Sequence, residues 1–360
     1  MEESRKLLKK WEWRGKITAF LGALLLAGMF LHGAAPGENF IYAGTGLKYY
    51  RNYSPEEYRY QPQNWCIIQD RSGIIYAANN GGVMKYDGVS WTLIPVTNQV
   101  VRSLAIDDAG TIYVGGVNEL GYLGPDSPDS RGQLKYISLV QHLEERTKNF
   151  DNVWRIHAVR EGIFFRTSKY LFRWNPQKKQ MNILLESKRG EDDRIRGSFT
   201  CGHRLLVKQG SAGLLELEND SFKIIVGARV FDELGPVFVM VPYDTAGKKI
   251  LIGTREKGFF IYDGNTLKDF PTEVDNYLKD KQIYHGIRLS QSPGDIAIAS
   301  LSGGIAVMDL QGKLKYLFAM DSGLQDNSVK YLFEDSQGKS MGRIRKWIGE
   351  NRIFIAAFRL

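Results

Sequence analysis

The sequence predicts an all-β fold: a seven-bladed β-propeller whose seventh blade is incomplete, preceded by an N-terminal signal or anchor segment. Two observations support the propeller. A strand-and-turn pattern repeats at intervals of about 35 to 50 residues, the size of one four-stranded blade. The composition also suits short strands joined by tight turns, because 38 glycines accompany 12% aromatic residues and only 11 prolines.

The repeat is clearest in two copies, which begin at Trp65 and Val101. Each copy runs from an apolar stretch through a D-x-x-G turn into an apolar-aromatic stretch, a glycine-rich turn and a strand that ends near a tyrosine. Weaker copies lie within residues 153–184, 197–226, 236–270 and 282–318, and a seventh begins at Ser328. One blade cannot bury both of its faces, so we expect the copies to stack in a ring over residues 48–338.

Short apolar runs and Asp-Gly pairs place the strands and turns inside each repeat. Residues 74–76 and 250–252 are continuous apolar runs, as expected for strands that are covered on both faces. Tyr86 and Tyr262 are each followed by Asp-Gly. Because this pair tolerates positive φ angles, we expect a two-residue hairpin turn at both positions.

Residues 1–35 read as an export signal. Six Lys and Arg residues within positions 1–16 precede an uncharged apolar run of 15 residues, Ile17–Leu31. As a helix this run would span only about 22 Å, which is shorter than the hydrocarbon core of about 30 Å. The sequence therefore favours a cleaved signal peptide, with residues 17–31 as a retained inner-membrane tether being the alternative. In both cases the body of the protein is expected to be exported.

The net charge of +8 does not indicate nucleic-acid binding. Residues 1–16 carry +3 and residues 339–360 carry +5, whereas the 36 basic and 36 acidic residues between them cancel. A neutral body with two basic ends offers no folded basic face for a phosphate backbone. No nucleic-acid partner is expected, and contact with a membrane is expected only through the N-terminal segment.

The sequence contains no recognisable catalytic or metal-binding motif. Cys66 and Cys201 lie far apart in different repeats and are expected to be small buried residues, not a disulfide framework. The five histidines show no metal-ligand spacing, and no nucleophile elbow or calcium loop is present. We therefore expect no enzyme activity, no metal and no cofactor.

The runs QNWCIIQDRSGIIYAANNGGVMKYDGVSW and GLQDNSVKYLFEDSQG resemble the two-component regulator propeller family. The resemblance covers about residues 48–338 and is faint between about 185 and 235. It implies a periplasmic, ligand-sensing and non-catalytic propeller that acts on downstream sensor domains, and an intact relative would carry a histidine kinase or another output module. A protein-interaction scaffold remains an alternative, and an enzyme propeller of the lyase or quinoprotein kind is a weaker one.

In a propeller, the residues at the start of each first strand lie around the central channel, where ligands bind. At these positions the sequence places Trp65, Arg102, Trp154, Arg155 and His285. Aromatic rings beside arginines suit a small molecule or an oligosaccharide, because they offer stacking and bidentate hydrogen bonds. The alternative is that both tryptophans pack between blades.

The repeat breaks after Gly338, and residues 339–360 lack the period-2 pattern of a strand. Read one base downstream, Met341-Gly342 must encode a tryptophan and Trp347-Ile348 must encode a glycine. Permissive codons elsewhere complete a strand, a glycine turn and a second strand, which are the missing parts of the seventh blade. We therefore expect residues 339–360 to be a frameshifted, non-native tail and the chain to be a truncated sensor.

Overall fold

The computed structural model describes residues 53–126, 133–188, 190–210, 212–290, 294–322, 324, 326–334 and 353–354. The chain divides after residue 42, and all of the described residues belong to the second unit, residues 43–360. The predicted export segment lies outside the described residues, as does the predicted tail apart from positions 353–354. Within the described part of the chain, no helix is long and apolar enough to cross a membrane.

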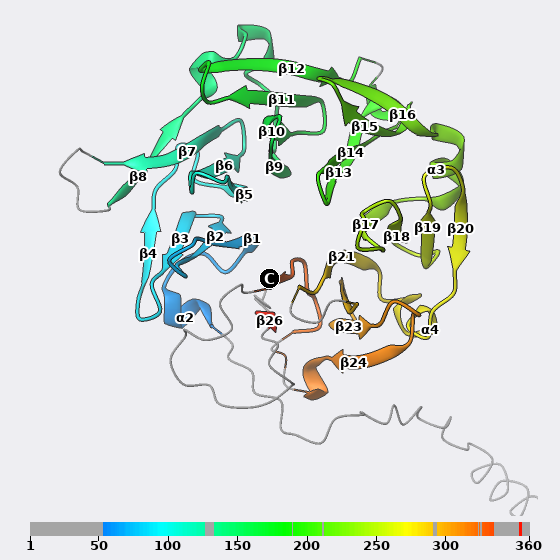
Figure 1. The fold of residues 1–360 in the computed structure, drawn as a ribbon. Helices are drawn as coiled ribbons and strands as arrows, with labels where there is room; N and C mark the ends of the chain where they lie inside the picture. Colours follow the sequence, from blue (N-terminus) through cyan, green and yellow to red (C-terminus); the bar gives the residue numbers. More distant parts are fainter. Residues whose placement is uncertain are drawn as a thin grey trace, which may run out of the picture. The chain divides into compact units, whose positions relative to one another are not determined.

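Six four-stranded antiparallel sheets form the described part of the second unit (Figure 1). Sheets one and two comprise β1 (Asn64–Gln69), β2 (Ile75–Asn79), β3 (Gly82–Tyr86), β4 (Trp91–Ile94), β5 (Val101–Ile106), β6 (Ile112–Gly116), β7 (Leu120–Pro125) and β8 (Leu134–Ser138). Sheets three and four comprise β9 (Arg155–Val159), β10 (Gly162–Arg166), β11 (Tyr170–Asn175), β12 (Gln180–Glu186), β13 (Ile195–Cys201), β14 (Arg204–Gln209), β15 (Gly213–Glu218) and β16 (Ser221–Gly227). Sheets five and six comprise β17 (Val237–Pro242), β18 (Ile250–Thr254), β19 (Phe259–Tyr262), β20 (Leu267–Phe270), β21 (Ile283–Arg288), β22 (Ile296–Ser300), β23 (Ile305–Met308) and β24 (Leu314–Phe318).

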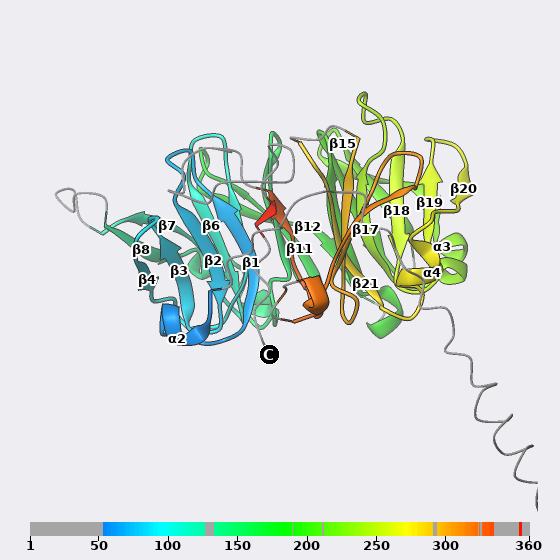
Figure 2. The ribbon, with the colours of Figure 1, turned by 90° about the horizontal axis from the view of Figure 1, so that it is seen from below.

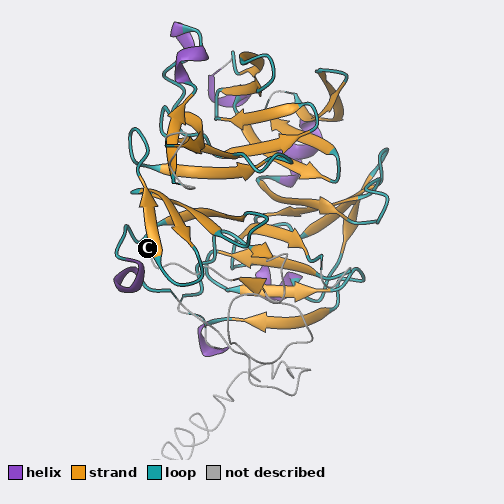
Figure 3. Cartoon of the chain, turned by 60° about the vertical axis from the view of Figure 1, so that its left-hand side comes forward, coloured by secondary structure: helices purple, strands orange, loops and turns teal. Residues whose placement is uncertain are grey.

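Each sheet is a meander whose strands pair in chain order. The first strand of every sheet faces the centre of the ring and the fourth lies at its rim, as Figure 1 shows. Seen from the side, the strands run through the thickness of the ring (Figure 2). Little of the unit is helical (Figure 3), and its short helices are α2 (Pro55–Tyr58), α3 (Ala228–Leu234), α4 (Asp275–Leu278), η1 (Val140–His142), η2 (Glu145–Thr147), η3 (Gly190–Asp193) and η4 (Met320–Ser322). The prediction of an all-β propeller is confirmed.

A seventh four-stranded sheet is not found among the described residues. There, β25 (Phe333–Glu334) pairs only with β26 (Ile353–Phe354). The segment 326–334 nevertheless lies beside the sixth sheet, because the N–H of Val329 donates to the carbonyl of Ser300 at 2.9 Å. Its Tyr331 also packs against the core of the first sheet. The count of seven blades is therefore not confirmed, although this segment lies between sheets six and one.

The hydrophobic core lies between neighbouring sheets, where the middle strands are buried on both faces. Strands β2, β6, β18 and β22 are buried along their whole length. Their continuous apolar sequence therefore reflects two covered faces, as the sequence predicted. Cys66 and Cys201 are buried in the hydrophobic core and form no disulfide bond. The prediction that both are small buried residues is confirmed.

The D-x-x-G segments form the turns between the first and second strands of their sheets. The Oδ1 of Asp70 accepts hydrogen bonds from the N–H groups of Ser72 and Ile74, at 2.9 and 3.0 Å. Gly73 has a φ of +87°, a conformation that side chains with a Cβ rarely adopt. Aspartate and glycine are therefore needed at these two positions to close the turn.

The turns that follow Tyr86 and Tyr262 are not the two-residue turns that the sequence predicted. Tyr86 pairs with Trp91, which leaves residues 87–90 as a four-residue loop. Only Gly88 in this loop has a positive φ, +96°. The carboxylate of Asp87 accepts from the N–H groups of residues 89 and 90, at 2.9 and 2.8 Å, and so stabilises the longer loop.

Candidate functional site

A β-bulge recurs at the same position of the innermost strands. In five of the six, the pairing register skips one residue near the start of the strand. The skipped residues are Trp65, Arg102, Arg196, Phe238 and Tyr284. Trp154 has the equivalent position in the third sheet, since its N–H donates to Arg166, whose ladder partner is Arg155. Bulges redirect side chains, so each blade aims one side chain at the same end of the ring centre.

Three of the predicted site residues meet at this end of the ring. The guanidinium carbon of Arg102 lies 4.0 Å from the ring centroid of Trp65 and 5.6 Å from that of Trp154. The two indole rings lie 6.4 Å apart in an edge-to-face arrangement. The Nζ of Lys330 lies 5.6 Å from the ring centroid of Trp65. We call Trp65, Arg102, Trp154 and Lys330 the central cluster.

The two remaining predicted residues lie one position further along their strands. The guanidinium of Arg155 lies 5.2 Å from the ring centroid of Tyr331, and the imidazole of His285 stacks on the same ring at 4.5 Å. Arg166 is the direct ladder partner of Arg155. We call Arg155, Arg166, His285 and Tyr331 the inner layer. Its members come from β9, β10, β21 and the segment 326–334.

Sequence reasoning missed Arg166, Lys330 and Tyr331. Arg166 ends a second strand and reaches the centre only through its pairing with β9, so the start-of-strand rule did not select it. Lys330 and Tyr331 belong to the seventh repeat, whose innermost position follows Val329 just as Trp154 follows Val153. The N–H groups of both valines donate to the preceding sheet, each at 2.9 Å. Aligning the seventh copy with the third could have identified them.

The arginines at the ring centre lack carboxylate partners among the described residues. None of Arg102, Arg155 and Arg166 forms an ion pair within that part of the chain. The Nη1 of Arg102 and the Nε of Arg166 are buried without a hydrogen-bond partner there. Burial, reinforced by the charge of Arg155, lowers the pKa of Arg166 to about 9. Burial also lowers the pKa of Arg102. The ring centre therefore holds uncompensated positive charge.

Two histidines near the centre are held neutral by their surroundings. The ring nitrogens of His157 lie 2.7 Å from the hydroxyls of Thr200 and Ser198. Burial, with the charges of two neighbouring arginines, lowers the pKa of His157 to about 3. The Nδ1 of His285 accepts the N–H of Leu332 at 3.1 Å, and burial lowers its pKa well below the ordinary value. These imidazoles are therefore positioned as structural groups and not as free bases.

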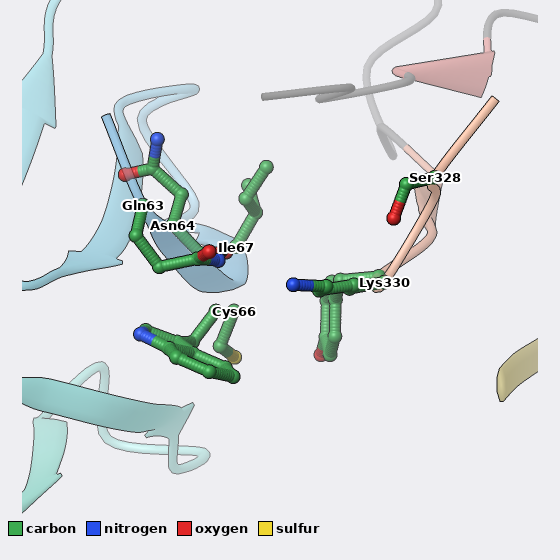
Figure 4. A pocket seen from close by; sticks show the side chains of 8 residues that line it. Gln63, Asn64, Cys66, Ile67, Ser328 and Lys330 are labelled. Atoms are coloured by element: carbon green, nitrogen blue, oxygen red, sulfur yellow. Dashed lines mark hydrogen bonds between the residues drawn. The ribbon is translucent and has the colours of Figure 1, made fainter. Parts of the chain in front are cut away.

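A pocket opens between the first sheet and the segment 326–334 (Figure 4). Lys330 points across it toward β1, as the figure shows. The residues that line it are Gln63, Asn64, Trp65, Cys66, Ile67, Ser328, Lys330 and Tyr331. The pocket is thus continuous with the central cluster and the inner layer. No group of His, Cys, Asp and Glu residues suited to a metal ion occurs in the described ranges.

Fold and site together define a β-propeller with an aromatic and cationic centre. A scan of protein families finds no match to this chain, and no curated protein matches it. Solved structures do match. One is described as the extracellular domain of a hybrid two-component system, BT3049 of B. thetaiotaomicron, with a TM-score of 0.59 and 17% identity over 79% of this chain and 39% of that one. Another, described as the extracellular domain of the one-component system BT4673 of the same organism, has a TM-score of 0.59 and 18% identity over 81% and 38% of the two chains.

Virginiamycin B lyase of Staphylococcus aureus is also similar, with a TM-score of 0.53 and 11% identity over 72% of this chain and 85% of that one. At these identities the likeness shows the propeller fold alone, and one propeller fold can serve unrelated functions. The chain spans about two fifths of the length of the two extracellular domains. The first of these domains comes from a two-component system, the class of protein that the sequence resembles.

Proposed function

We propose that this chain is the exported, ligand-sensing propeller of a two-component-type receptor, and that it is not an enzyme. The observation that carries the proposal is the convergence of Trp65, Arg102 and Trp154, from three different blades, at one end of the ring centre. A ligand bound there would contact several blades at once. Binding would therefore change how the propeller sits against downstream domains.

The ligand we propose is a small molecule or an oligosaccharide. The exposed parts of the half-buried rings of Trp65 and Trp154 can stack on a sugar face. The arginine and lysine beside them supply hydrogen-bond donors for hydroxyl or charged groups. The packing alternative is compatible with this proposal, since Trp65 also contacts the core between the first two sheets.

The enzyme alternative would need a free acid or base at the ring centre. His157 and His285 are each engaged in hydrogen bonds, so neither is a free base at the ring centre. This observation favours sensing over lyase-type chemistry. The scaffold alternative predicts no small-molecule affinity at the ring centre, and the experiment below separates the two.

We further propose that the segment 326–334 is the innermost strand of a seventh blade. Its hydrogen bond to Ser300 and its packing against both the sixth and the first sheet support this position. A cleaved signal or a tether at residues 17–31, and downstream output domains, belong to the same proposal. The likeness to extracellular domains of signalling systems is consistent with export.

The test is a binding titration of the full chain against neutral gluco-oligosaccharides and uronic-acid oligosaccharides, followed by thermal shift. We expect one class of sugar to give a saturable shift and to be recovered chemically unchanged. Trp65→Leu should weaken binding by about tenfold, because a stacking surface is lost. Trp91→Leu is the matched control, since Trp91 lies on the rim strand β4 and should leave affinity unchanged. Product formation, or equal weakening by both substitutions, would contradict the proposal.

A further inference from the structure

Resting on the proposed function, we propose that the ligand carries an oxyanion, namely a carboxylate, sulfate or phosphate group, which Arg102, Arg155 and Arg166 bind at the ring centre. The three arginines belong to adjacent blades, on β5, β9 and β10. Arginine matches this chemistry because its planar fork donates two parallel hydrogen bonds to such groups. Within the described part of the chain, no carboxylate forms an ion pair with any of the three.

The fold brings Arg155 and Arg166 together in one ladder and places Arg102 on the neighbouring blade. Arg155 and Arg166 are directly opposed in the β9–β10 ladder, so their side chains leave the same face of the sheet. Tyr284, from the sixth sheet, interacts electrostatically with both Arg102 and Arg166. Arg102 also reaches toward the third sheet, because its guanidinium carbon lies 5.6 Å from the ring centroid of Trp154, which precedes Arg155 in the chain.

This arrangement is costly in the absence of a ligand. Like charges that are directly opposed in a sheet destabilise it. The buried Nε of Arg166 and the buried Nη1 of Arg102 have no partner among the described residues, and an unmatched buried donor also costs stability. A bound oxyanion would accept hydrogen bonds from these donors and offset the repulsion.

The described groups that lie against Arg102 and Arg155 include neutral partners. Arg102 donates from its Nε to the side-chain oxygen of Asn152 at 2.8 Å, and the guanidinium carbon of Arg155 lies 5.2 Å from the ring centroid of Tyr331. Both of these partners are neutral. Asp151 is an exposed carboxylate that attracts Arg102, but its Oδ1 accepts from the amide of Asn152 at 2.8 Å.

A structural arginine of the same propeller looks different. Arg204 on β14 meets Glu216 on β15 through two hydrogen bonds, of which the Nη2–Oε2 bond is 2.7 Å long. Both carboxylate oxygens are used, and the charge of this arginine is compensated within one sheet. Unlike Arg204, the central arginines have no ion-paired carboxylate among the described residues, and an external oxyanion would fill that position.

The experiment is calorimetric titration of the full chain with sodium sulfate, sodium phosphate and sodium glucuronate, at constant ionic strength set with sodium chloride. We expect saturable one-site binding of at least one of them, which also identifies the oxyanion. Arg166→Gln and Arg102→Gln should each weaken that binding by at least about tenfold, because hydrogen bonds from a charged donor are lost. Arg160→Gln is the matched control, since it removes the same charge from an exposed turn beyond the other end of β9.

The melting temperature without anion is a second measurement, which distinguishes a role of Arg166 in anion binding from a role in stabilising the fold. Without anion, Arg166→Gln should melt at a higher temperature than the unsubstituted chain, because an uncompensated charge is removed. Equal weakening by Arg160→Gln, or no saturable binding of any of the three anions, would overturn the assignment. If neutral sugars still bind and depend on Trp65 in that case, the sensing function stands and only the anion is wrong.

Discussion

His157 illustrates how single residues near the ring centre are specialised. Its imidazole is buried between two hydroxyls and stays neutral, whereas Arg155 and Arg166 in the same sheet form no ion pair with a carboxylate among the described residues. The hydrogen bonds of His157 are satisfied by groups of the next sheet, as expected for a structural residue, whereas the buried Nε of Arg166 has no partner among the described residues.

The buried imidazole of His157 is expected to make the free energy of unfolding depend on pH. The pKa of His157 is about 3 in the folded chain and about 6.5 when unfolded, so between these values only the unfolded state binds the proton. The contribution of His157 is therefore complete above about pH 6.5 and is lost as the pH falls toward 3. His157→Gln should reduce the slope of the unfolding free energy between pH 6.5 and 4 by up to about 1.4 kcal/mol per pH unit.

This slope is measured by urea denaturation at a series of pH values. His285 shifts in the same direction, so part of the slope should remain in the variant. His203→Gln serves as control because His203 is exposed. An unchanged slope in the His157 variant would show that its burial does not govern the acid sensitivity.

At the scale of elements, the turns hold each blade in register. Asp70 is more than a turn former: besides two backbone N–H groups, its carboxylate accepts the hydroxyl of Tyr76 at 3.4 Å. In the second sheet, Asp107 and Tyr113 repeat the contact at 3.2 Å. The spacing of aspartate, glycine and tyrosine therefore joins a turn to the buried second strand that follows it.

We predict that Asp70→Ala lowers the free energy of unfolding by about 2 kcal/mol, because three hydrogen bonds lose their acceptor. Asp70→Asn keeps one acceptor oxygen and should cost less than half as much. Asp108→Ala, at an exposed position of the neighbouring turn, is the control and should change stability by under about 0.5 kcal/mol. Urea denaturation measures all three, and equal losses for Asp70→Ala and Asp108→Ala would refute this role.

For the molecule as a whole, the sequence repeat was sufficient to predict the ring and some residues at its centre, but not all of them. Trp65, Arg102 and Trp154 have equivalent positions in successive copies of the repeat, and the structure brings their side chains together. The β-bulge that turns these side chains toward the ring centre depends on how two strands pair. The pattern of apolar residues along one strand does not reveal this pairing. Arg166 reaches the centre through an antiparallel partner, a relation between two strands that no single-strand pattern shows.

Closure of the ring depends on the strands that lie between sheets six and one. The segment 326–334, which we propose as the innermost strand of a seventh blade, has the two-residue β26 as its only strand partner within the described residues. The outer strands of a blade protect the edge of its innermost strand, so we expect strand sequence directly after Gly338. We predict that the reading frame one base downstream of codon 340 encodes it, beginning with the forced tryptophan and glycine. Sequencing the gene through this codon decides the matter: continued +1 translation should give a strand, a glycine turn and a strand, and a frame without further propeller sequence would refute the prediction.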